Sequence, residues 1–119
     1  MAAMADEIRR GARRFEVWFP IEIESETTDR DVAISKDVSP KGILLATPTR
    51  VEVGAEVKIR FTLSSPKPVE HVVEGVIVRV ERKHKQAEDI WRYQVAVQFD
   101  QEIPELEEAL ALMVIDQNI

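Results

Sequence analysis

The sequence contains no cysteine, only two histidines and four glycines, and few aromatic residues. The lack of cysteine excludes disulfides, thiolate metal sites and thiol nucleophiles. The histidines, His71 and His84, belong to no cluster of metal ligands, which argues against a zinc centre. The few glycines leave no phosphate-binding loop of the Gly-x-x-x-x-Gly-Lys type. We therefore expect neither a metal site nor an enzyme built on these chemistries.

Long apolar segments are also missing. The longest uninterrupted apolar run, Ala109–Ile115, is far shorter than the roughly 18 residues that indicate a membrane span. The first residues lack the basic stretch and the apolar core of a signal peptide. The length of 119 residues suits one compact domain. The sequence therefore predicts a cytoplasmic protein without membrane insertion.

The net charge of −6 is divided unevenly along the chain. Residues 1–14 carry four arginines against two acidic residues, a local charge of +2, whereas the remaining 12 basic and 20 acidic residues give −8. Arginine grips phosphate or a guanine edge through a planar, two-pronged guanidinium. Four such groups suit a small anionic ligand, and the acidic body argues against a long nucleic acid. The alternative is a solvated arm that forms salt bridges with the protein's own acids.

Alternating apolar residues predict six short β-strands. The predicted strands cover Phe15–Glu24, Asp31–Lys36, Ile43–Thr47, Ala55–Leu63, Val69–Arg82 and Trp91–Phe99. Pro20 falls on the outward face of the first strand. The segment Lys36–Gly42 has the composition of a turn, and Gly75 is expected to mark a bulge or a sharp curl of the fifth strand.

The same alternation predicts which side chains face the core. In the second strand we expect Val32 and Ile34 to point inward. Trp91 and Tyr93 are expected in the core at the start of the sixth strand. Inward positions are also expected for the fifth-strand residues Val72, Val76, Val78 and Val80.

After Phe99 the apolar period becomes helical. Pro104 suits a first helical turn, and the acidic residues around Glu107 suit the positive end of a helix dipole. No histidine or nucleophile accompanies these acids, so they do not predict acid-base catalysis. We expect a helix at about 103–116. The whole pattern predicts an all-β domain with a C-terminal helix, namely a small six-stranded antiparallel β-barrel over residues 15–119, preceded by a flexible arginine-rich arm at 1–14.

Two motifs resemble those of the PilZ domain family. Arg10-Gly-Ala-Arg-Arg14 has the family's Arg-x-x-x-Arg spacing just before the first strand. Asp37-Val-Ser39-Pro-Lys-Gly42 has the Asp/Asn-x-Ser-x-x-Gly pattern just before an apolar strand. The resemblance extends over nearly the whole chain. It implies a six-stranded antiparallel barrel that binds the bacterial second messenger cyclic di-GMP.

The resemblance also implies which residues bind the ligand. They are Arg9, Arg10, Arg13, Arg14, Asp37, Ser39 and Gly42, with Lys41 and Ala96 as further candidates. Arg9 with Arg13 forms a second, overlapping Arg-x-x-x-Arg pair, and the alternation of the first strand favours Arg10 with Arg14. Asp37 and Ser39 have the alternative role of holding a turn. Ala96 stands where many members of the family have glycine.

These expectations make the chain a cyclic di-GMP receptor without a catalytic role or cofactor. Its arm would change conformation on binding and signal to an unidentified protein partner, as a monomer or a homodimer. The alternative is a ligand-independent adaptor in pilus or motility machinery. A third possibility, a single-strand RNA binder, is less consistent with scattered basic residues and inward aromatic residues.

Overall fold

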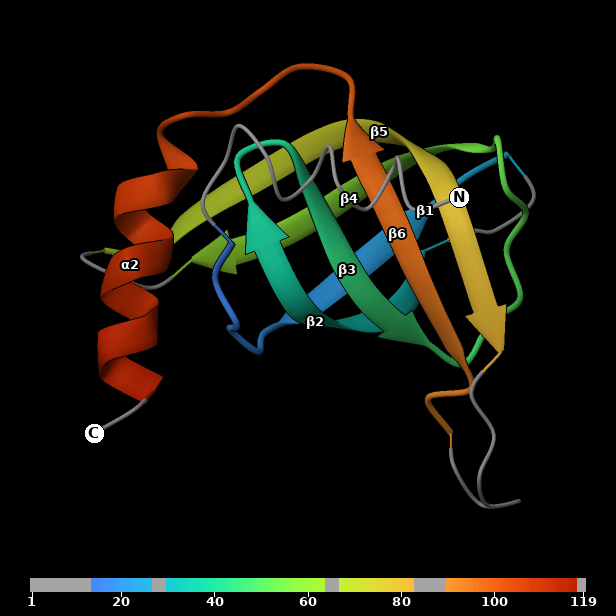
Figure 1. Ribbon diagram of the computed structural model, residues 1–119, viewed down its shortest axis with the longest axis horizontal. Helices are drawn as coiled ribbons and strands as arrows, with labels where there is room; N and C mark the ends of the chain where they lie inside the picture. Colours follow the sequence, from blue (N-terminus) through green and yellow to red (C-terminus); the bar gives the residue numbers. More distant parts are fainter. Residues whose placement is uncertain (1–13, 27–29, 64–66, 83–89, 118–119) are drawn as a thin grey trace.

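The structure is a computed structural model that describes residues 14–26, 30–63, 67–82 and 90–117. Within these residues six antiparallel strands close into a barrel, and a helix follows the last strand (Figure 1). The elements are β1 (Pro20–Glu24), β2 (Asp31–Ser39), β3 (Gly42–Thr47), β4 (Glu56–Leu63), β5 (Val69–Arg82), β6 (Tyr93–Phe99) and α2 (Leu106–Gln117). The predicted six-stranded antiparallel barrel with a C-terminal helix is confirmed.

The strands follow the order β1-β2-β3-β6-β5-β4, and pairing of β1 with β4 closes the barrel. α2 lies beside one end of the barrel and packs against β2 and β4 (Figure 1). Its buried side chains are Leu106, Leu110 and Met113, the residues that the helical period placed on one side. Among the described residues, no helix has the length and apolarity needed to cross a membrane.

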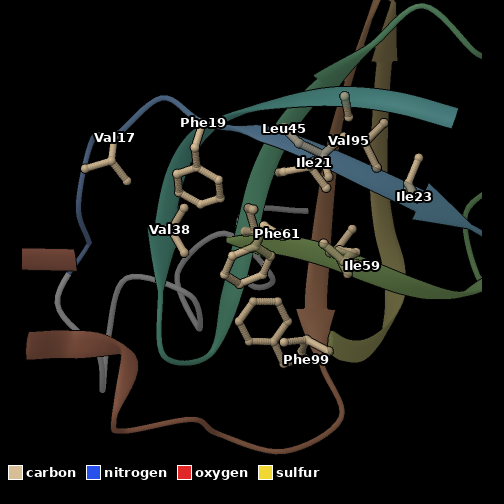
Figure 2. Close-up of a cluster of buried hydrophobic side chains, with 14 of the residues drawn as sticks. Val17, Phe19, Ile21, Ile23, Val38, Leu45, Ile59, Phe61, Val95 and Phe99 are labelled. Carbon is tan, nitrogen blue, oxygen red and sulfur yellow. The ribbon is translucent and has the colours of Figure 1, made fainter. Parts of the chain in front are cut away.

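The barrel is filled by alternate side chains of its strands. Figure 2 shows Phe19 and Phe61 inside the barrel, where their ring centroids lie 5.2 Å apart. Around them pack Ile21, Ile23, Leu45, Ile59, Val95 and Phe99, all at most 5% exposed. Burying each such side chain contributes about 1.5–3 kcal/mol relative to leaving it in water. The alternation predicted for the first and fourth strands therefore describes the core correctly. In the sixth strand it does so from Val95 onward.

The predicted inward face is wrong for β2 and for the part of β5 before its register shift at Ile77–Arg79. Val32 is 57% exposed and Val72 is 47% exposed, whereas their neighbours Ala33 and Val73 are buried. Register explains this difference, because residues directly opposite in an antiparallel pair point to the same face of the sheet. Ala33 lies opposite the buried Ile21.

Other predicted core positions, in β5 and at the start of β6, are only partly buried. In β5, Val76 and Val78 are half-buried, while Ile77 between them fills the core. Val80 lies opposite the buried Val95 and packs against the core, as predicted, although it is itself half-buried. Trp91 and Tyr93 are half-buried, and Tyr93 packs against the core. Both β2 and β5 carry apolar residues in consecutive positions, so a period of two does not decide which of them faces inward.

Two features of strand geometry differ from expectation. Gly75 marks no bulge; the register shift in β5 lies between Ile77 and Arg79. A Cβ on Gly75 would lie 2.5 Å from the backbone oxygen of Gln98, so glycine permits close contact with β6. In β2 the strand continues to Ser39, and the turn expected at Lys36–Gly42 shrinks to its last residues before β3.

The segment before β1 is extended but is not a regular strand. Residues 14–20 alternate between exposed and buried, as the sequence predicts. The backbones of Phe15 and Val38 exchange two hydrogen bonds, of 2.8 and 2.9 Å. The buried Ser35 hydroxyl accepts a hydrogen bond from the Phe19 N–H and donates one to the Val17 carbonyl. These contacts hold the segment alongside β2.

Candidate ligand-binding site

The strand registers place two of the predicted ligand-binding residues and two of their cross-strand neighbours in one row on the outer surface of the barrel. Asp37 lies opposite Leu44, Leu44 lies opposite Ala96, and Ala96 lies opposite Arg79. The row therefore crosses β2, β3, β6 and β5. Parallel to it, Ser39, Gly42, Gln98 and Val76 form the next row. Residues far apart in the sequence thus share one continuous surface.

A bulge in β2 turns Asp37 toward this surface. The register shifts between Ser35 and Asp37, so Lys36 is an extra residue on this strand. Ser35 and Val38 are both buried, at 1% exposure. Regular alternation from Ser35 would have pointed Asp37 into the core; the bulge instead leaves Lys36 and Asp37 outside.

Arg14 and Asp37 form an ion pair on this surface. The Arg14 Nη2 donates to the Asp37 Oδ2 at 2.6 Å. Arg14 is in reach because Phe15, the next residue, is bound to Val38 through its backbone. The structure thereby brings together the last arginine of the first motif and the aspartate of the second.

The other carboxylate oxygen of Asp37 is buried and has no hydrogen-bond partner among the described residues. The Asp37 side chain as a whole is only 16% exposed. A buried acceptor without a partner costs about 1–3 kcal/mol, more when it is charged. Oδ1 is therefore an acceptor positioned for a donor that the described part of the chain does not supply.

Ser39 and Gly42 shape the turn that follows. The buried Ser39 hydroxyl accepts hydrogen bonds from the N–H groups of Lys41 and Gly42, at 3.1 and 3.2 Å. The Lys41 carbonyl accepts the Phe99 N–H, which ties the turn to the end of β6. Ser39 thus has the turn-holding role left open by the sequence, and Gly42 lies in strand conformation at the start of β3. Both stabilise the edge of the surface that carries Asp37.

Ala96 is 5% exposed and lies between Leu44 and Arg79 in the row of Asp37. Neighbouring strands are about 4.8 Å apart, so Ala96 lies two strands and roughly 10 Å from Asp37. Sequence reasoning missed Arg79 as a member of this surface. Its outward position agrees with the predicted alternation, but the pairing that sets it opposite Ala96 cannot be seen in the sequence.

The arginines Arg9, Arg10 and Arg13 lie outside the described residues. Their contacts, and the choice between the two overlapping pairs, therefore remain predictions. Within the described ranges no group of three or more acidic or histidine side chains is arranged to hold a metal ion.

Comparisons with known proteins agree with this architecture. Residues 8–116 match a family model described as PilZ domain. No curated protein matches the chain. Among solved structures, the chain is similar to the Bacillus subtilis inhibitor of motility (MotI/DgrA), with 18% identity and a TM-score of 0.67. It is also similar to the PilZ domain of CeSA from a cellulose-synthesizing bacterium, with 14% identity and a TM-score of 0.56.

The two alignments cover different shares of the proteins compared. The first alignment includes 92% of this chain but 51% of MotI/DgrA, so this chain spans about half the length of that protein. The second includes 90% of this chain and 99% of the CeSA domain. At these identities the likeness is one of fold.

Proposed function

The chain belongs to the PilZ domain family, and from this premise we propose that it is a cyclic di-GMP receptor that signals to a protein partner. Domains of this family bind cyclic di-GMP and act as receptors or adaptors rather than enzymes. The observation that carries the proposal is the Arg14–Asp37 pair, in which the buried Asp37 Oδ1 has no hydrogen-bond partner among the described residues. It joins the two motifs on one surface.

The chemistry of this pair fits a guanine nucleotide. A guanine presents N–H donors on one edge and the O6 and N7 acceptors on another. The Oδ1 of Asp37, which no described residue binds, is an acceptor for such a donor, and a charge-assisted bond of this kind is stronger than a neutral one. Arg14 has further N–H groups beyond the one that binds Asp37, and these suit a phosphate or the O6 and N7 edge.

The remaining candidates complete the proposed site. Arg9, Arg10 and Arg13 would neutralise phosphates from the arm at residues 1–14, and Lys41 would add a positive charge beside the turn. Ser39, Gly42 and Ala96 would shape the barrel surface beneath the ligand. In this proposal the arm folds over the ligand and the ordered arm forms the surface that a partner recognises. The proposal keeps the cytoplasmic location expected from the sequence.

One observation favours the second candidate function, a ligand-independent adaptor. Arg14 and Asp37 already neutralise each other without a ligand. A surface closed by this ion pair is able to serve as a constant docking face. MotI/DgrA, one of the similar structures, is named as an inhibitor of motility, so a component of the motility machinery is a reasonable kind of partner to test.

Isothermal titration with cyclic di-GMP tests the proposed function. Arg14→Ala and Asp37→Ala should each weaken binding at least tenfold, because each removes a charge-assisted contact of about 1.5–3 kcal/mol. Arg50→Ala is the matched control, since Arg50 is 76% exposed and lies beyond the opposite end of β3. Its affinity should equal that of the wild type.

A folded wild-type protein that gives no heat up to high micromolar cyclic di-GMP would overturn the proposal and leave the adaptor function. Wild-type binding with unchanged affinity in both variants would show that the ligand uses a different surface.

A further inference from the structure

A groove on the outer surface of the barrel is lined by both tryptophans of the chain. Its volume is about 270 Å³. The lining residues are Trp18, Ile34, Ser35, Lys36, Ala46, Trp91 and Gln94. The chain contains no other tryptophan. Neither sequence motif includes any of these lining residues, so the groove has no role in the function proposed above.

The groove continues the surface that carries Asp37. Its floor contains the row in which Ile34 lies opposite Ala46 and Ala46 lies opposite Gln94. This row is two residues, or about 7 Å, along β3 from Leu44 in the row of Asp37.

The two tryptophans enter the groove from different parts of the chain. Trp18 belongs to the extended segment that starts with Arg14, and the alternation from Arg14 to Pro20 puts both on the outer side. Trp91 lies two residues before the start of β6. The contacts of Ser35 with Val17 and Phe19 fix the backbone on both sides of Trp18.

The lining has the chemistry of a site for a planar, polar ring. Trp18 is 65% exposed and its indole forms part of the groove's lining. Ile34 and Ala46 make the floor apolar, and the Gln94 amide supplies both a donor and an acceptor for a ring edge. Lys36 makes no ion pair with the described residues and adds a positive charge at the side nearest Asp37. The volume is smaller than that of pockets for drug-sized molecules, which suits a single base.

We propose that this groove is a base-binding subsite in which one guanine of a cyclic dinucleotide stacks on a tryptophan, while Asp37 and Arg14 hold the remainder of the ligand. This inference rests on the proposed function. Gln94 contacts the edge of the stacked base, and Lys36 contacts the adjacent phosphate. Lys36 favours a nucleotide over an apolar side chain of a protein partner, because an ammonium group beside the groove attracts a phosphate.

Tryptophan fluorescence reports directly on this groove, since both tryptophans line it. We would titrate the full chain with cyclic di-GMP and record heat and fluorescence on the same samples. Stacking of a guanine on an indole should quench the fluorescence, with saturation at the ligand concentration that saturates the heat. The free energy of base stacking on an aromatic side chain predicts that Trp18→Leu or Trp91→Leu binds the ligand roughly 5- to 150-fold more weakly than the wild type.

Two control variants separate stacking from general effects. Trp18→Phe retains an aromatic face and should bind more tightly than Trp18→Leu. Val72→Ala truncates an exposed apolar side chain on β5 that lies opposite Arg60, away from the groove, and should bind like the wild type. Unfolding midpoints in urea establish that each variant is folded at the temperature of the titration.

The possible outcomes distinguish the two proposals. Heat of binding without quenching, together with unchanged affinity in both tryptophan-to-leucine variants, overturns the groove and leaves the cyclic di-GMP receptor standing. An absence of both heat and quenching overturns the receptor and the groove together. Equal affinities of Trp18→Leu and Trp18→Phe, together with an unchanged affinity of Trp91→Leu, also overturn stacking, because neither aromatic face would then have an effect.

Discussion

Asp37 shows how one residue depends on its neighbours for its chemistry. Its Oδ2 binds Arg14 at 2.6 Å, while its Oδ1 is buried without a partner among the described residues. The resemblance to a known motif predicted that Asp37 and Arg14 belong to one site, and the structure brings them together. The bulge at Lys36 was not predicted, because nothing in the turn-like composition of this segment indicates an extra residue within a strand.

His71 is a second residue whose surroundings change its properties. Its ring stacks on Phe61, with centroids 5.4 Å apart. Burial lowers the pKa of His71 below its ordinary value of 6.5, and the negative charge of Glu105 opposes this shift. The folded protein therefore binds this proton less tightly than the unfolded chain does.

We expect His71 to reduce stability as the pH falls. Its contribution is fully present above about pH 6.5 and is lost as the pH drops through that value toward the lower pKa of the folded state. Urea unfolding of the wild type and His71→Gln at pH 7.5, 6.5 and 5.5 measures this. The free energy of unfolding of the wild type should fall relative to that of the variant. A wild type that gains stability relative to the variant at pH 5.5 would mean that Glu105 outweighs burial.

At the scale of the strands, the sequence predicts some faces well and others wrongly. In β4, apolar and polar residues alternate strictly, and the predicted inward residues, from Val57 to Leu63, are buried. In β2 and β5, consecutive apolar residues fit either face, so pairing with the neighbouring strand decides the orientation. Ile21 orients β2 and Ile59 orients β5 through residues directly opposite them. Arg79 was missed for a different reason, because only the pairing of β5 with β6 brings it opposite Ala96.

The pairing of β5 with β6 depends on Gly75. A methyl group at this position would meet the backbone oxygen of Gln98 at 2.5 Å and a methyl of Val97 at 2.9 Å. Because the backbone oxygen belongs to the strand pairing, Gly75→Ala should lower the free energy of unfolding by about 1–3 kcal/mol, as overpacking does. Urea unfolding measures the loss, with Val72→Ala on the same strand as the control. A Gly75→Ala protein with the wild-type midpoint would contradict this close approach.

At the scale of the whole molecule, charge and architecture support the same class of ligand. The barrel carries most of the acidic residues of a chain whose net charge is −6, and this argues against long nucleic acids. The outer surface across β2, β3 and β6 carries Arg14, a carboxylate oxygen that no described residue binds, and the groove lined by the two tryptophans. The barrel fold was predictable because alternating apolar residues mark each of the six strands along the chain. The groove was not, because its two tryptophans are 73 positions apart and lie outside the regular strands.

The central claim is that this surface recognises guanine, and a comparison of cyclic di-GMP with cyclic di-AMP by isothermal titration tests it most directly. Adenine lacks the N1–H and N2 amino donors that would satisfy the Oδ1 of Asp37. The account predicts binding of cyclic di-GMP at least tenfold tighter than that of cyclic di-AMP, the ratio expected for about 1.4 kcal/mol. Equal affinities for the two dinucleotides, or no binding of cyclic di-GMP by the folded protein, would contradict it.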